Sequence, residues 1–172
     1  MRSRTEAFPR PFATALVALI AVSTLVASVA VSEADNGLPE PDTAWFEGAT
    51  GFAAGFEQAQ AENQSVLVYF YADWCGYCRQ LEFELLDQST VEDYTKYLVK
   101  IRINPEKGAH ERQIANRYGV AGYPAVFVHS ASSVRPRRVG RMVVDGGKRR
   151  LMTPEEYVRR LVSVTGFSFG TS

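Results

Sequence analysis

Residues 66–78 read Val-Leu-Val-Tyr-Phe-Tyr-Ala-Asp-Trp-Cys-Gly-Tyr-Cys and contain both cysteines of the 172-residue chain. The first six of these residues are apolar and rich in β-branched and aromatic side chains, which predicts a strand covered on both faces. The apolar run ends at Ala72. After the cysteines, Leu81, Leu85 and Leu86 recur at helical spacing. The two cysteines are therefore expected where a buried strand gives way to a helix.

The spacing of the cysteines favours a chemical role over a structural one. Cys75 and Cys78 close almost no loop, so a disulfide between them contributes little entropic stabilisation. At a helix N-terminus, unpaired backbone N–H groups and the macrodipole stabilise a thiolate on Cys75. Cys78 follows one helical turn later, where it can resolve a mixed disulfide between Cys75 and a substrate. Gly76 leaves the backbone clear for this approach, and Tyr77 is expected to tune the redox potential.

A metal site is the weaker interpretation of the same two cysteines. A structural zinc ion needs four ligands in a closed site. The chain has no second CxxC pair, and its two histidines, His110 and His129, fall on separate predicted elements without ligand spacing. We therefore expect no metal and no diffusible cofactor.

The other apolar patterns alternate between helix and strand. Helices are predicted near residues 52–63, 81–86, 110–118 and 153–164, and strands near residues 66–71, 97–103, 125–129 and 138–144. The last helix has a strong start, with Thr153 as N-cap, Pro154 at the first helical position and Glu156 three residues after the cap. This order predicts an α/β three-layer sandwich: a central mixed sheet of about four strands with helices on both faces.

The N-terminus has the layout of a targeting segment. A basic start is followed by nineteen uncharged residues, 13–31, which would span about 28 Å as a helix, close to a bilayer core. Small residues precede plausible cleavage positions after Ala30 and Ala34. Residues 1–34 are thus predicted to be a signal peptide or a retained membrane anchor. We expect residues 35–50 to be a linker and residues 51–172 the folded domain, in the periplasm or otherwise outside the cytoplasm.

Charge is distributed unevenly although the formal net charge is zero. Residues 33–95 contain thirteen acidic residues and one basic residue, whereas residues 96–160 contain fifteen basic and five acidic residues. Two explanations remain open: a solvated surface, or a charged docking surface for a partner or lipid headgroups. Nucleic acid is not an expected partner, because the chain has no binding motif for it and is predicted to be exported.

From about residue 52 to residue 164 the sequence resembles the thioredoxin superfamily. The resemblance is carried by Tyr-Ala-Asp-Trp-Cys-Gly-Tyr-Cys at 71–78 and Tyr-Gly-Val-Ala-Gly-Tyr-Pro at 118–124. It implies that Pro124 follows a cis peptide bond beside the cysteines, and that the backbone of Tyr123 receives a substrate strand. Trp74, Gly76 and Tyr77 complete the expected substrate-binding set. The tetrapeptide Cys-Gly-Tyr-Cys is also similar to that of bacterial periplasmic disulfide isomerases.

Two positions depart from the pattern of the superfamily. Thioredoxins keep a buried carboxylate six residues before the first cysteine, where this chain has Tyr69. This aid to proton transfer is therefore missing or replaced. Lys100 matches the lysine that neighbours that carboxylate, and it is predicted either to support the thiolate or to face water.

These features predict an extracytoplasmic thiol–disulfide oxidoreductase acting on protein disulfides or dithiols, with a reductase or isomerase favoured over an oxidase. Cys75 attacks, Cys78 resolves, and a membrane redox partner resets the pair. The alternative is a non-catalytic peptide-binding, chaperone-like module on the same fold. A thiol peroxidase is disfavoured, because Trp74 and Gly76 rather than hydroxyl and arginine side chains flank the first cysteine.

Overall fold

The computed structural model describes residues 44–131, 133 and 135–167. The elements in chain order are β1 (Trp45–Glu47), α1 (Gly48–Ala61), β2 (Val66–Phe70), α2 (Gly76–Leu81), the π-helical turn η1 (Glu82–Leu86), α3 (Ser89–Thr95), β3 (Val99–Ile103), α4 (Ala109–Arg117), β4 (Ala125–His129), β5 (Arg137–Val139), β6 (Met142–Asp145), β7 (Lys148–Leu151) and α5 (Pro154–Thr165). The predicted signal or anchor segment, residues 1–34, lies outside the described residues.

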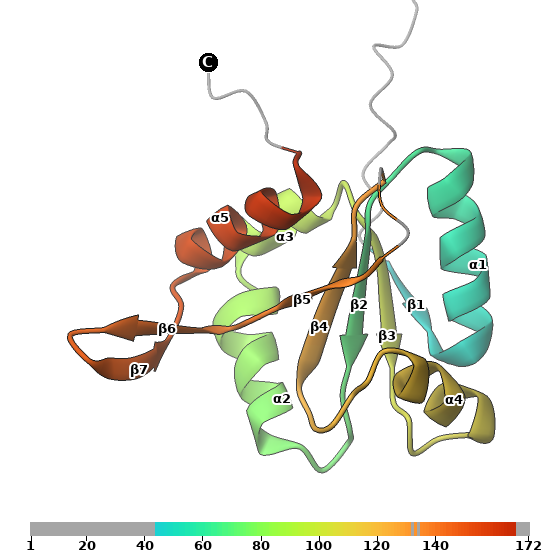
Figure 1. The fold of residues 1–172 in the computed structure, drawn as a ribbon, viewed down its shortest axis with the longest axis horizontal. Coiled ribbons are helices and arrows are strands. Elements are labelled where there is room, and N and C mark those ends of the chain that lie inside the picture. Colours follow the sequence, from blue (N-terminus) through green and yellow to red (C-terminus); the bar gives the residue numbers. More distant parts are fainter. Residues whose placement is uncertain (1–43, 132, 134, 168–172) are drawn as a thin grey trace, which may run out of the picture. The chain divides into compact units, whose positions relative to one another are not determined.

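The predicted buried strand is β2, and it lies in the middle of a five-stranded mixed sheet. The strand order is β1-β3-β2-β4-β5, with β1, β2 and β3 parallel and β4 and β5 antiparallel to their neighbours. All five residues of β2 are buried, as expected for a strand with helices on both faces. In Figure 1, α1 and α4 cover one face of the sheet and α2, α3 and α5 the other, so the predicted three-layer sandwich is confirmed.

Each face of the sheet has its own apolar core. On one face, side chains of β2 and β3 pack against Ala59 of α1 and Ile114 of α4. Gly55 allows α1 to lie close to the sheet, because a Cβ at this position would come within 2.9 Å of Ile101 Cδ1. The other face buries Tyr157 and Leu161 of α5 together with both cysteines. Cys75 and Cys78 are therefore part of the second core.

The sheet has one more strand than expected because of a segment predicted to be a linker. Residues 45–47 form β1, which pairs with β3, and α1 begins at Gly48. The last six residues of the predicted linker, 45–50, therefore belong to the fold. Trp45 and Phe46 are β-prone and apolar, but the surrounding Gly, Pro and Asp residues dominated the prediction. Residues 35–43 of the predicted linker lie outside the described residues.

The strand predicted at 138–144 is two strands. β5 ends at Val139, and after Gly140 and Arg141 the chain begins β6, which pairs only with β7 in a separate two-stranded sheet. Gly146 and Gly147 both have positive φ, at 55° and 79°. A two-residue hairpin loop of this type needs residues that tolerate positive φ. The glycine pair was the signal for this hairpin, and our sequence reasoning missed it.

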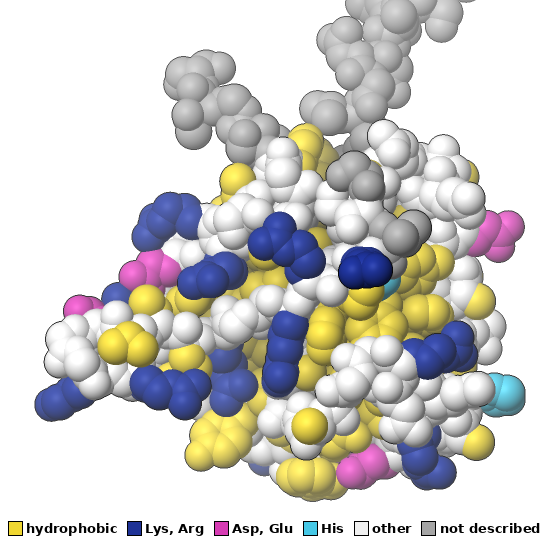
Figure 2. Space-filling view, in the orientation of Figure 1, with side chains coloured by type: hydrophobic (Ala, Val, Ile, Leu, Met, Phe, Trp, Pro, Cys, Tyr) yellow, Lys and Arg dark blue, Asp and Glu magenta, His cyan; other side chains and the backbone are white. Residues whose placement is uncertain are grey.

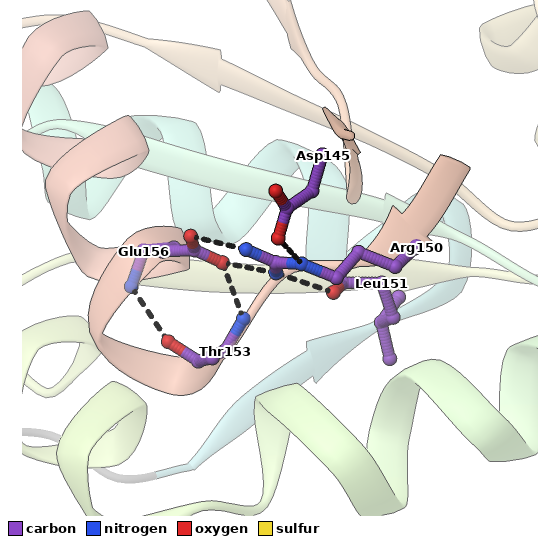
Figure 3. Close-up of polar contacts among 5 residues, drawn as sticks. All are labelled: Asp145, Arg150, Leu151, Thr153 and Glu156. Carbon is purple, nitrogen blue, oxygen red and sulfur yellow. Dashed lines mark hydrogen bonds and ion pairs between the residues drawn. The ribbon is translucent and has the colours of Figure 1, made fainter. Parts of the chain in front are cut away.

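Arg150 connects the hairpin to α5 through a fork of hydrogen bonds (Figure 3). Its Nη1 and Nη2 donate to Glu156 Oε2 and Oε1 at 2.7 and 2.9 Å, and its Nε donates to Asp145 Oδ2 at 3.0 Å. Glu156 also completes the predicted capping box, since Thr153 N donates to Glu156 Oε2 and Glu156 N donates to Thr153 Oγ1. One carboxylate thus starts α5 and holds the hairpin against it.

This arrangement predicts an acid-resistant contact. Hydrogen bonds from Arg150 and from the Thr153 backbone lower the pKa of Glu156 from 4.5 to about 2. A depressed folded-state pKa adds stability above the ordinary carboxyl pKa, and this stability is lost as pH falls toward 2. Glu156→Gln should therefore lower the unfolding temperature at pH 7, with the difference shrinking below about pH 4.5 and vanishing near pH 2.

Thermal unfolding of both proteins across this pH range measures the effect. Glu57→Gln, at an exposed glutamate of α1, is the control. A difference between wild type and Glu156→Gln that stays constant from pH 7 to pH 2 would contradict the ion-pair explanation.

Candidate active site

Cys75 and Cys78 form a disulfide at the junction of β2 and α2. Cys75 is the N-cap of α2, and the backbone N–H of Cys78 points at its sulfur, with an N···Sγ distance of 3.1 Å. The same N–H also donates to the Cys75 carbonyl oxygen, with an N···O distance of 3.1 Å. This hydrogen bond is the first of the helix. When the disulfide is reduced, this N–H and the helix N-terminus favour the thiolate of Cys75 over that of Cys78.

The disulfide lies almost entirely below the surface. Cys75 is 3% exposed and Cys78 is 1% exposed, whereas the flanking Trp74 and Tyr77 are 67% and 65% exposed. The larger exposed fraction therefore belongs to Cys75, and the aromatic side chains next to the cysteines in the sequence are open to solvent.

The loop before β4 brings the second sequence motif to the disulfide. The peptide bond between Tyr123 and Pro124 is cis. The ring centroids of Tyr123 and Trp74 lie 6.3 Å apart, and Tyr123 packs against the core cluster that contains both cysteines. Pro124 shares a pocket with Leu81, which lies three residues after Cys78. Two motifs about fifty residues apart in the sequence thus form one site.

The loop after β3 holds Trp74 in place. Trp74 Nε1 donates to Oε1 and Oε2 of Glu106 at 3.1 and 2.9 Å. The backbone N–H of Glu106 in turn donates to Oδ1 of the buried Asn104 at 3.0 Å. Sequence reasoning missed Glu106, because Asn104 and Pro105 indicated only the end of a strand. The same loop contributes Lys107, whose Nζ lies 3.6 Å from Asp73 Oδ2.

Lys100 is a buried residue of β3. It is 6% exposed, and its Nζ lies 5.5 Å from the ring centroid of Trp45. The alternative that Lys100 faces water is therefore wrong. Its predicted support of the thiolate remains a prediction.

Tyr69, six residues before the first cysteine, is hydrogen-bonded to a carboxylate from another element. The hydroxyl of Tyr69 donates to Glu82 Oε1 at 2.9 Å. Burial, with the nearby charge of Glu82 as a smaller cause, raises the pKa of Tyr69 well above its ordinary value of 10. Tyr69 therefore stays protonated and donates its hydroxyl hydrogen to Glu82 of η1.

No group of three or more His, Cys, Asp or Glu side chains in residues 44–131, 133 and 135–167 is placed to hold a metal ion. No helix in the same part of the chain is both long and apolar enough to cross a membrane. The uncharged segment at 13–31 lies outside the described residues.

Two cysteines joined by a disulfide at a helix N-terminus, with a cis-proline loop in the same site, form an arrangement that can take part in thiol–disulfide exchange. Comparison with known proteins identifies the family. Residues 52–142, more than half of the chain, match the Thioredoxin-like domain family, and the chain belongs to that family.

Curated relatives carry names of the same class. The chain is 30% identical over 107 residues to Protein disulfide isomerase-like 2-2 of Oryza sativa subsp. japonica, and this match covers 55% of the chain and 28% of the relative. It is 35% identical over 86 residues to Protein disulfide-isomerase of Gallus gallus, covering 49% of the chain and 16% of the relative. The matched part of the chain spans less than a third of either relative.

Solved structures share the fold at lower identity. A thioredoxin from Thermus thermophilus is 23% identical with a TM-score of 0.53, covering 71% of this chain and 88% of that one. A structure described as DsbH oxidoreductase is 15% identical with a TM-score of 0.52, covering 68% and 83%. The oxidised C-terminal domain of DsbD from Neisseria meningitidis is 20% identical with a TM-score of 0.51, covering 70% and 99%.

The geometry predicts which thiol reacts first in the reduced protein. Cys75 accepts the N–H of Cys78 and keeps the larger exposed area, so limiting iodoacetamide at pH 7 should alkylate Cys75 in preference to Cys78. Peptide mapping by mass spectrometry measures the ratio. Equal labelling, or labelling mainly at Cys78, would contradict the assignment of Cys75 as the attacking thiol.

Proposed function

We propose that the protein is an extracytoplasmic thiol–disulfide oxidoreductase that exchanges disulfides with protein clients through Cys75 and Cys78. The observation that carries the proposal is the disulfide at the start of α2, next to the cis-proline loop. Family membership and relatives named as protein disulfide isomerases support it. The location outside the cytoplasm rests on the targeting layout of residues 1–34 and on the class of these relatives.

The reaction moves two electrons in two exchange steps. In the reducing direction, the Cys75 thiolate attacks one sulfur of a client disulfide, forming a mixed disulfide and releasing the other client sulfur as a thiolate. The Cys78 thiolate then attacks Cys75 Sγ. The Cys75–Cys78 disulfide forms and the second client thiolate leaves, so the client is reduced and the protein oxidised. In isomerisation, the released client thiolate attacks another disulfide of the same client. A different client thiolate then attacks the mixed disulfide, which forms a new client disulfide and restores the Cys75 thiolate.

Trp74, Gly76, Tyr77, Tyr123 and Pro124 form the proposed client-binding surface. Trp74 and Tyr77 present exposed rings on either side of the first cysteine. The backbone next to Pro124 would pair with an extended client segment. The hydrogen bonds from Trp74 to Glu106 hold one side of this surface in place.

We favour a reductase or isomerase over an oxidase. The curated relatives are named as isomerases, and a DsbD domain is among the proteins that share the fold. After each reduction the Cys75–Cys78 disulfide must be reduced again. A membrane redox partner is the proposed electron source, because an exported domain has no direct access to cytosolic reductants.

A peptide-binding module without redox activity is the second candidate. The observations in its favour are the near-complete burial of both cysteines and the exposure of three aromatic side chains, Trp74, Tyr77 and Phe83. Exposed aromatic side chains of this kind are typical of protein-binding surfaces.

Two serine variants separate these candidates. Cys75→Ser should reduce insulin disulfides no faster than the uncatalysed reaction, because the attacking thiolate is gone. Cys78→Ser should instead accumulate a mixed disulfide with insulin, because the resolving thiol is missing. Turbidity measures the rate, and non-reducing electrophoresis detects the adduct.

The double variant Cys75→Ser/Cys78→Ser is the control for the adduct and should form none. If Cys75→Ser matched the wild-type rate of insulin reduction, the oxidoreductase proposal would fail and the binding module would remain.

A further inference from the structure

The β6–β7 hairpin has one anchored face and one open face. Side chains alternate between the two faces of a strand. Val143 and Arg150 stand opposite each other in the register and face α5, where Arg150 binds Glu156. Val144 and Arg149 form the next pair, on the other face, and Val144 is 67% exposed. The hairpin therefore leaves an apolar and a basic side chain, Val144 and Arg149, uncovered on this second face.

The open face continues into a pocket that reaches the active site. The pocket has a volume of about 320 Å³. Its apolar lining consists of Leu81, Pro124, Val126, Val139 and Met142. Met142 belongs to the hairpin, whereas Pro124 is the cis-proline beside the disulfide. A segment bound at Pro124 is thus directed along the pocket toward the hairpin.

The charged groups of this pocket all have the same sign. Arg138, Arg141 and Arg149 line it, and none of its described lining residues carries a carboxylate. The guanidinium group of Arg141 lies 5.7 Å from the ring centroid of the exposed Tyr77, next to the disulfide. Unlike Arg150, neither Arg138 nor Arg149 forms an ion pair with any described residue. Figure 2 shows Lys and Arg side chains gathered over the hairpin and β5.

We propose that this pocket and the open face of the hairpin, together called the basic groove, bind an extended acidic segment of the client protein beside its reacting disulfide. Guanidinium groups bind carboxylates through paired hydrogen bonds, and the arginines here have no acidic partner to displace. A four-residue strand is about 13 Å long, so the hairpin offers room for about four extended residues. The inference rests on the proposed function and adds a client class to it.

Three synthetic peptides test the proposal on the full chain. Each contains one disulfide, and they differ only in four neighbouring residues, which are all Glu, all Gln or all Lys. At low ionic strength, kcat/KM for the Glu peptide should exceed that for the Gln peptide by about tenfold, and the Lys peptide should be the slowest. In about 1 M salt, where the Debye length is about 3 Å, the three values should converge.

Arginine variants assign the preference to the groove. Arg149→Gln should weaken the Glu-over-Gln ratio, and R141Q/R149Q should reduce it to below about threefold. The control R117Q/R160Q removes the same amount of charge from exposed arginines of α4 and α5 that do not line the pocket. This control should keep the wild-type ratio.

The outcomes separate the groove from the proposed function. Equal kcat/KM for all three peptides, or a ratio unchanged in R141Q/R149Q, would overturn the groove while leaving disulfide exchange intact. Equal rates together with a dimer in light scattering would assign the open face to a contact between copies of the chain. Failure to reduce any peptide or insulin would overturn both proposals.

Discussion

Strand β2 is hydrogen-bonded on both sides and buried along its whole length, and the position of the site follows from this strand. Its last residue, Phe70, stands opposite Ile103 of the parallel β3 and Ala125 of the antiparallel β4. The loops that leave β2 and β3 and the loop that enters β4 therefore meet at one edge of the sheet. These loops contribute the disulfide, Glu106 with its hold on Trp74, and the cis-proline.

Burial and hydrogen bonding give the two sulfur atoms different surroundings. The Cys78 side chain belongs to the core, while its backbone N–H is aimed at the Cys75 sulfur. In the proposed reaction the client meets Cys75, which is the more exposed of the two cysteines, and Cys78 resolves the mixed disulfide from its buried position. The hairpin extends this surface on one side, and it can do so because Arg150 fixes its opposite face to α5. Both cysteines thus belong to the start of α2, whereas the rest of the proposed client-binding surface comes from other elements.

Most helices and strands and both motifs of the site could be predicted from the sequence, and each feature that was missed has a physical cause. The apolar run at 66–71 and the cap at Thr153 produced correct elements because local pattern and tertiary environment agree there. β1 was missed because three residues carry too little periodicity to outweigh a Gly- and Pro-rich context. The carboxylate that meets Tyr69 was missed because it arrives from η1. Contacts between separate elements produce no regular spacing of residues in the sequence. The contacts of Glu106 with Trp74 and of Glu82 with Tyr69 are therefore visible only in the structure.

A redox titration tests the central claim most directly. The purified protein is equilibrated in glutathione and dithiothreitol buffers of defined ratio, and the oxidised fraction of Cys75–Cys78 is read by alkylation and mass spectrometry. We expect one reversible two-electron transition, at a potential more reducing than the glutathione couple, as a client-reducing pair requires. A disulfide that remains intact in excess dithiothreitol, or that does not re-form on reoxidation, would show that the cysteines are structural and would contradict the proposed chemistry.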